Sequence, residues 1–234
     1  MEQFVYSDIF DTKGIEYIIV IFFFMLLIPF WYLLNRPVKL KELMNDTIRA
    51  INLQALRIPQ GLLFNRNHTW SHLEKSGVAS VGMDDLLLHL TGGVELNYLK
   101  ERQEKVKRGE AIARIFQKGK ELVITSPISG EIDRVHSSLE DNSGAISKDP
   151  YRSWLYRIRP EKWLEETGDA MMAEQASEWT GKELERFRDF LAESVAESSG
   201  AEVVLQEGGE LTGHPLSEMD KDAWEGFQEK FLTI

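Results

Sequence analysis

The side chains that most often do chemistry in proteins form no catalytic pattern in this sequence. His68 and His72 are four residues apart, a spacing that can bind a metal ion when both lie on a helix. Here they flank Trp70 in a segment expected to be strand or loop, and no carboxylate partner is placed beside them by pattern. The chain has no cysteine, which excludes disulfides, thiolate nucleophiles and cysteine-based metal sites. We therefore expect no metal site.

Motifs for nucleophilic catalysis and phosphate binding are also missing. The sequence has no Gly-x-Ser-x-Gly, no ordered set of Ser, Asp and His, and no Walker A or Rossmann glycine pattern. Residues 164–234 contain 18 acidic and 5 basic residues, whereas nucleic-acid binding requires a basic surface. We expect a protein that is not an enzyme and has no nucleic-acid partner.

Two lysine amines, those of Lys118 and Lys120, flank Gly119 between two apolar runs. Glycine adopts a positive φ without steric cost, and such residues form the two-residue turns of β-hairpins. The Lys-Gly-Lys run therefore predicts a hairpin tip that its lysines keep soluble.

Short apolar runs separated by Gly, Asn, Pro and Ser predict a small β-rich barrel or sandwich at residues 57–163. The expected strands are Val78–Val81, Gly93–Leu99, Ala111–Phe116, Glu121–Thr125 and Glu131–Val135. Met83–Leu90 breaks this pattern and predicts a short helix capped near Asp84. The strands that begin Gly93-Val-Glu-Leu and Gly130-Glu-Ile-Asp are each followed by another apolar run, which predicts a quasi-two-fold sandwich.

A set of motifs within residues 57–163 resembles, in order, the H-protein of the glycine cleavage system. The matching runs are His68-Thr69-Trp70, Val81-Gly82-Met83, Thr91-Gly92-Gly93, Val106-Lys107-Arg108-Gly109-Glu110, Ser126-Pro127-Ile128-Ser129-Gly130-Glu131-Ile132, Asp149-Pro150-Tyr151 and Trp154-Leu155. No single run is specific for the family, but the occurrence of all of them in the family's order is. The resemblance implies the biotinyl/lipoyl-type hammerhead barrel, a single-hybrid motif.

In that family a lysine at a hairpin tip carries the lipoyl group, and here this position holds glycine. Ten residues on from Gly109 and eight residues back from Pro127 both lead to Gly119. The Glu, Ser and Val that precede the lysine in the family are replaced as well. The resemblance thus implies a domain without cofactor. Lipoate on the neighbouring Lys118 or Lys120 stays as an alternative, although a shift of one residue turns a side chain to the other face of a hairpin.

Residues 15–35 are expected to form a transmembrane helix that follows a short external tail at residues 1–14. The run Ile15–Leu34 contains one charge, Glu16, and about 20 apolar residues span the ~30 Å hydrocarbon core of a bilayer. Basic residues follow directly, at Arg36, Lys39 and Lys41. By the positive-inside rule, the chain is expected to be a single-pass protein of the inner (cytoplasmic) membrane, with its N-terminus outside and its soluble domain in the cytoplasm.

Residues 36–56 are expected to be a basic amphipathic juxtamembrane segment. Apolar residues within Val38–Leu53 recur at helical spacing on one face. This helix either packs on the following domain or lies on the inner leaflet with its basic residues near lipid phosphates.

Residues 164–234 are expected to form an acidic, mostly helical C-terminal region that is ordered because it has aromatic residues to bury. Gly181–Val195 predicts a helix with Thr180 as its N-cap, and Met171–Glu178 is a further helical candidate. Ser217–Phe231 predicts a second helix. Its expected buried face is Met219, Ala223, Trp224, Phe227 and Phe231. Val203–Leu211 predicts a tight hairpin between the two helices.

The expected fold class is therefore α+β: a transmembrane helix, a lipoyl/H-protein-like hammerhead barrel and an acidic helical appendage. The expected function is that of a membrane-anchored, non-catalytic interaction or scaffold subunit at the cytoplasmic face. Its expected partners are the lipid bilayer and a membrane or cytoplasmic protein. The alternative is a lipoyl-dependent carrier of a glycine-cleavage-like system, modified at Lys118 or Lys120. A transport adaptor of the membrane-fusion type would need a long α-hairpin inside the barrel sequence, and none is seen.

Overall fold

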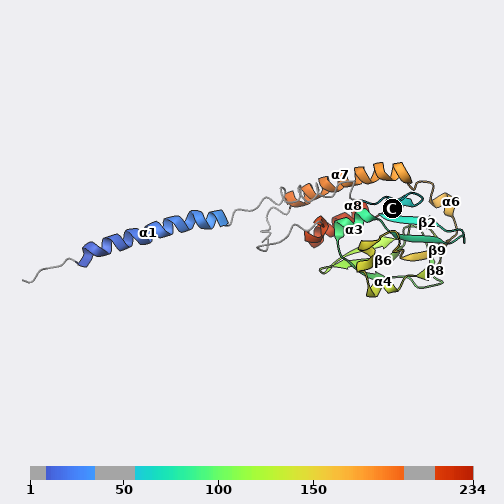
Figure 1. The fold of residues 1–234 in the computed structure, drawn as a ribbon, viewed down its shortest axis with the longest axis horizontal. Coiled ribbons are helices and arrows are strands. Elements are labelled where there is room, and N and C mark those ends of the chain that lie inside the picture. The colour runs from blue at the N-terminus through green and yellow to red at the C-terminus, as the bar shows by residue number, and fades with distance from the viewer. Residues whose placement is uncertain (1–8, 35–55, 198–213, 234) are drawn as a thin grey trace, which may run out of the picture. The chain divides into compact units, whose positions relative to one another are not determined.

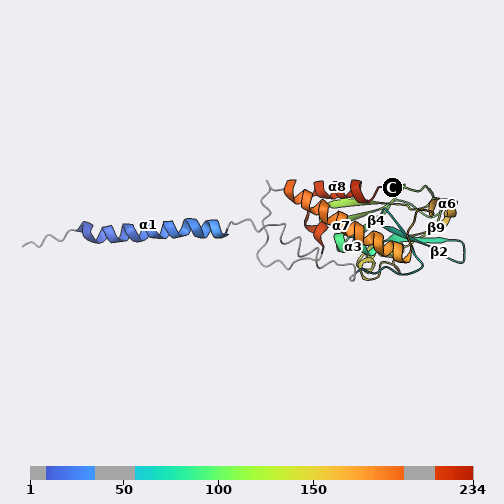
Figure 2. The same ribbon diagram turned by 90° about the horizontal axis from the view of Figure 1, so that it is seen from above.

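The computed structural model describes residues 9–34, 56–197 and 214–233 of the chain. It divides into two compact units, Met1–Leu40 and Lys41–Ile234. Figures 1 and 2 show the elements of each unit from two perpendicular directions.

The first unit contains the helix α1 (Ile9–Leu34), drawn in blue in Figure 1. Its side chains are described at residues 17–31, and all of them are exposed. In the part of the chain that the structure describes, no helix is both long enough and apolar enough to cross a membrane. The anchor predicted at residues 15–35 is therefore not confirmed. The juxtamembrane segment predicted at residues 36–56 lies, apart from Leu56, outside the described residues.

The second unit is built on two antiparallel β-sheets. The six-stranded sheet has the order β1-β2-β3-β9-β8-β5, and the three-stranded sheet has the order β4-β6-β7. The strands are β1 (Leu63–Asn65), β2 (Thr69–Leu73), β3 (Ala79–Met83), β4 (Glu95–Tyr98), β5 (Lys105–Val106), β6 (Ala111–Gln117), β7 (Lys120–Thr125), β8 (Gly130–Val135) and β9 (Tyr156–Pro160). All five strands predicted from alternation are present within one or two residues at each end.

The predicted repeat is confirmed as a pattern of pairing. β4 pairs with β6, and β8 pairs with β9, so each first strand of the repeat pairs with the apolar run that follows it. The two halves are nevertheless unequal, because β1, β2, β3 and β5 all extend the sheet that contains β8 and β9.

The core lies between the sheets and is filled by side chains that alternate along the strands. Leu122 and Ile124 of β7 and Ile115 of β6 are buried, while the residues between them are more exposed. Gly130 has no room for a side chain, because a Cβ atom there would lie 2.2 Å from the carbonyl oxygen of Arg159.

The helix α3 (Asp85–Thr91) is capped as predicted. A carboxylate oxygen of Asp84 accepts a hydrogen bond from the backbone N–H of Leu87 at 2.8 Å, which satisfies one of the unpaired donors of the first turn. Three shorter helices follow: α4 (Ser138–Asp141), α5 (Gly144–Lys148) and α6 (Trp163–Glu166).

The C-terminal helices differ from the prediction at their starts. α7 is one helix over Ala173–Glu197, so the N-cap predicted at Thr180 is wrong. The Thr180 hydroxyl donates instead to the carbonyl of Ala176 at 2.8 Å, a bond that lets threonine sit within a helix. The second helix is divided into a 3-10 turn, η1 (Pro215–Glu218), and α8 (Lys221–Phe231), because Asp220 caps α8 by accepting from Ala223 N.

Aromatic residues join α7 to α8, which Figures 1 and 2 both show side by side. Phe187 of α7 meets Phe227 of α8 edge-on at 5.7 Å, and Phe227 stacks on Phe231, also of α8, at 4.8 Å. The buried face predicted for the second helix is confirmed at all four positions within α8. The hairpin predicted at residues 203–211 lies outside the described residues.

Candidate functional site: a covered hairpin tip

The hairpin of β6 and β7 turns through two residues, as the sequence predicts. Gln117 pairs with Lys120, which leaves Lys118 (φ 49°) and Gly119 (φ 79°) as the loop. Positive φ at both central residues is the mark of a type I′ turn, whose twist matches that of the two strands.

Position 119, to which the resemblance assigns the lipoyl lysine, holds a glycine with open space around it. An added Cβ atom would find no described atom within 4 Å, although its φ of +79° strains any L side chain. Space for a side chain is therefore available at this position.

The two flanking lysines lie in different surroundings. The side chain of Lys118 is 64% exposed, and its amine lies 3.2 Å from a carboxylate oxygen of Glu218, which is 58% exposed. A pair this exposed contributes little to stability. Lys118 is thus the amine of the hairpin tip that solvent reaches.

The Lys120 amine is bound and partly buried by the C-terminal segment, residues 214–233. Its Nζ donates to the carbonyl of Ser217 at 2.7 Å and to that of Met219 at 2.6 Å. It also lies 5.1 Å from the centre of the Trp224 ring, within the range of a cation–π contact. Burial, together with the positive charge of Lys118, lowers the pKa of the Lys120 amine. An amide nitrogen formed by acylation has one hydrogen and could not make both bonds.

α8 also covers the open edge of β7. The side-chain amide of Gln228 accepts from Val123 N at 2.6 Å and donates to Val123 O at 3.2 Å. These are the two bonds that a further strand would make, and satisfying them protects an edge from pairing with another chain. Trp224 anchors this cover, because its ring is fully buried and its Nε1 donates to Leu216 O at 2.7 Å.

The start of the C-terminal segment is fixed to α3. His214 Nδ1 lies 2.9 Å from the carbonyl oxygen of His89, and the His214 ring packs where a side chain at Gly92 would stand, 2.7 Å from its Cβ position. The amphipathic pattern of Ser217–Phe231 revealed that this helix is buried. No sequence signal showed that the hairpin tip is what it covers.

His68 and His72 do not converge. His72 Nδ1 lies 3.1 Å from Gly61 O on the exposed side of the β1–β2 hairpin, whereas His68 is buried with its Nδ1 2.9 Å from Asp84 Oδ2. The sequence pattern placed no carboxylate beside these histidines. In the structure, the carboxylate beside His68 is that of Asp84, the residue that caps α3. Within residues 56–197 and 214–233, no cluster of His, Asp and Glu side chains could hold a metal ion.

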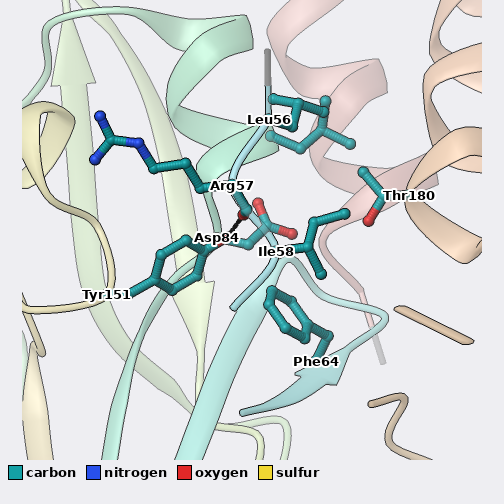
Figure 3. Close-up of a pocket in the computed structure, with 8 residues that line it drawn as sticks. Leu56, Arg57, Ile58, Phe64, Asp84, Tyr151 and Thr180 are labelled. Carbon is teal, nitrogen blue, oxygen red and sulfur yellow. Dashed lines mark hydrogen bonds between the residues drawn. The ribbon is translucent and has the colours of Figure 1, made fainter. Parts of the chain in front are cut away.

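A narrow crevice beside Asp84 offers no room for a ligand. Figure 3 shows it between Ile58, Phe64, Tyr151 and Thr180, where the Tyr151 hydroxyl donates to Arg57 O. The crevice is too narrow to admit a water molecule. Burial raises the pKa of the Tyr151 hydroxyl, so it stays a hydrogen-bond donor.

Comparisons with known proteins find relatives of the β-sheet domain. The protein-family model described as "Glycine cleavage H-protein" matches residues 62–183. Curated relatives include the "Probable glycine cleavage system H protein" of Pyrococcus abyssi, 28% identical over 129 residues, which cover 55% of this chain and 96% of the relative. The protein of that name from Picrophilus torridus is 32% identical over 127 residues, or 54% of this chain and 98% of the relative.

A solved structure is also similar. It is that of a glycine cleavage system H protein from Mycobacterium marinum, with 24% sequence identity and a TM-score of 0.47, covering 53% of this chain and 99% of that one. The family match includes every strand of both sheets, from β1 to β9, and extends into α7. Since it spans more than half of the chain, the protein belongs to the glycine cleavage H-protein family.

Proposed function

We propose that this protein is a non-catalytic member of its family, an interaction or scaffold module that has no lipoyl arm. The observation that carries this proposal is the hairpin tip. The resemblance assigns the family position to Gly119, and the C-terminal segment binds and partly buries the amine of Lys120. A swinging arm needs an exposed attachment point, and the ligase that attaches it must reach the amine.

The alternative, a working lipoyl carrier, has Lys118 as its favoured site. Its amine is the more exposed of the two at the tip, and the relatives named above are described as H proteins of glycine cleavage. Against this alternative, Lys118 lies one residue before the family position, and its amine is directed toward Glu218.

Intact-mass measurement of the protein purified from its native host tests this choice. We expect an unmodified mass, and the same mass after incubation with a lipoyl ligase that modifies a control H protein. A lipoyl adduct that disappears in Lys118→Arg, while Lys120→Arg retains it, would overturn the proposal in favour of the carrier.

We propose further that an N-terminal anchor holds this module at the cytoplasmic face of the membrane. Support comes from the 20-residue run Ile15–Leu34 and from the exposure of every described apolar side chain of α1, from Tyr17 to Trp31. An anchor confines the module to a thin layer and raises its effective concentration toward other membrane proteins.

Alkaline extraction of native-host membranes tests the anchor. The protein should stay in the membrane pellet, and a variant with charged residues at Phe23 and Leu27 should be released into the supernatant. Release of the unaltered protein would refute the anchor and leave the proposal of a non-catalytic module intact.

Affinity purification from detergent-solubilised membranes tests the interaction role. A partner protein should be recovered with the full chain at a fixed ratio. A wild-type protein that purifies alone at every detergent and salt concentration tried would contradict this role.

A further inference from the structure

His68 is held in an unusual position by two reciprocal contacts with Asp84. It lies in the turn between β1 and β2 with φ 56°, a left-handed conformation that is uncommon outside glycine. Asp84 N donates to His68 O at 3.0 Å, and Asp84 Oδ2 lies 2.9 Å from His68 Nδ1. The side chain of His68 is only 1% exposed, so the imidazole is fixed well inside the molecule.

The other ring nitrogen is directed at α7. His68 Nε2 is buried without a hydrogen-bond partner among the described residues, and its nearest charge is a carboxylate oxygen of Glu183, 4.0 Å away. Two aromatic rings complete its surroundings. The centre of Trp179 on α7 lies 5.2 Å from the centre of the imidazole, and that of Phe231 on α8 lies 6.4 Å from it.

The contacts of Asp84 decide where the proton of the imidazole lies. Asp84 uses one carboxylate oxygen to cap α3 and presents the other to His68 Nδ1, so Nδ1 carries a hydrogen and donates it. A neutral ring would then direct the lone pair of Nε2 at the carboxylate of Glu183. An imidazolium directs an N–H there instead, and therefore attracts both carboxylates.

The charges that face His68 come from several elements and oppose one another. Burial is the largest influence and disfavours the cation, and Arg186 of α7, which binds Glu183 at 3.2 Å, adds to that. Asp84 and Glu183 outweigh both, and the pKa of His68 is raised above its ordinary value. α8 contributes the uncharged ring of Phe231, while Lys230 pairs with Glu193. Asp85 accepts from Arg57 N and pairs with His89.

We propose that His68 is a proton-dependent latch, whose imidazolium bridges Asp84 of the barrel to Glu183 of α7 and so fastens α7 and α8 to the barrel. The latch itself does not depend on the proposed function. Its consequence at the hairpin tip does, because α8 carries the residues that cover Lys120.

The direction of the pH effect follows from linkage. A group whose pKa is higher in the folded state stabilises that state fully below its unfolded pKa, which for histidine is 6.5. The stabilisation is lost as the pH rises through the raised pKa of the folded state. Alkaline conditions should therefore loosen α7 and α8 while the sheets remain intact.

Hydrogen exchange of the full chain in detergent, followed by mass spectrometry, tests the latch without any mutation. After correction for intrinsic exchange, peptides from α7 and α8 should exchange several-fold faster at pH 9 than at pH 6, and those from β8 and β9 should not change. In parallel, ¹⁵N NMR should show His68 as imidazolium at pH 6.

A matched pair of variants tests the residues. Glu183→Gln should shift the onset of α7 and α8 exchange to lower pH, because it removes one of the two attracting charges. His136→Gln should leave the onset of exchange unchanged, because the His136 ring stacks on Trp154, away from the latch. Exchange of α7 and α8 that does not depend on pH, or a neutral His68 at pH 6, would overturn the proposal. Exchange that rises equally in all peptides would overturn it too, because global loosening needs no latch.

Discussion

Replacement of Trp224 by alanine should uncover the hairpin tip. The Trp224 ring is fully buried on α8 with its centre 5.1 Å from Lys120 Nζ, and its Nε1 donates to Leu216 O at 2.7 Å. Truncation of a buried tryptophan to alanine costs about 3–5 kcal/mol, and an unpaired buried carbonyl adds about 1 kcal/mol or more. We expect most of this loss to fall on the contact between α8 and β7, where Lys120 meets the Trp224 ring.

The reactivity of Lys120 toward an amine-acylating reagent measures this loss. Since 1.4 kcal/mol is a factor of ten, a loss of about 3 kcal/mol should raise the acylation rate of Lys120 by about 100-fold. The rate should level off where it equals that of Lys118, the exposed amine two residues away, which serves as an internal reference in the same sample. Peptide mass spectrometry resolves the two sites.

Trp31→Ala provides the matched control, because the indole of Trp31 is 63% exposed on α1. It should leave the acylation rate of Lys120 unchanged. The reasoning is refuted if Lys120 and Lys118 react equally fast in the wild-type protein, or if Trp224→Ala leaves their ratio as it was.

Three further substitutions, one of them a control, test the barrel and its cover. Gly130→Ala should lower the free energy of unfolding by about 3 kcal/mol or more, because the new Cβ would lie 2.2 Å from Arg159 O. Gly93→Ala is the control. It should change the free energy of unfolding by less than about 0.5 kcal/mol, because no atom beyond its chain neighbours lies within 4 Å of the new Cβ among the described residues. Chemical denaturation would measure both, and equal effects would contradict the argument. Gln228→Glu should cost about 1–3 kcal/mol, because a carboxylate accepts from Val123 N but is repelled by Val123 O. Its thermal midpoint should fall, and an unchanged midpoint would show that the edge of β7 does not need this cover.

The sequence was sufficient to predict the strands in which hydrophobic alternation is regular. β6, β7 and β8 have four or more residues that alternate between core and surface, and their bounds were predicted closely. β1 and β5 have three and two residues, which is too short for a period of two to show. They exist because neighbouring strands provide the hydrogen bonds, and this information is not local.

Contacts between residues far apart in the chain could not be predicted from the sequence pattern. Asp84 was recognised as a helix cap, but its second oxygen binds His68, 16 residues earlier in the chain, across a turn of unusual backbone conformation. Lys120 was predicted to keep the hairpin tip soluble. Its amine is instead held by carbonyls 97 and 99 residues away, because α8 returns to the edge of β7. Neither contact leaves a periodic signal in the sequence.

The motifs by which this chain resembles the family are explained by packing and hydrogen bonding within the barrel. They support the shape of the domain and do not depend on chemistry at the hairpin tip. Trp70 and Gly82 are opposite each other on β2 and β3, and the Trp70 ring lies where a side chain at Gly82 would stand. The Ser126 hydroxyl donates to Ile128 O at 2.7 Å, and Gly130 gives Arg159 room to pair. These residues build a barrel whether or not it bears an arm.

The C-terminal segment covers the hairpin tip and the open edge of β7. Without this cover the hairpin tip would be exposed and the edge of β7 would be open. In this chain Trp224, Gln228 and the Ser217 carbonyl occupy that surface in three different ways, by packing, by edge pairing and by binding an amine. Three independent contacts at one place show that the hairpin binds the C-terminal segment of the same chain.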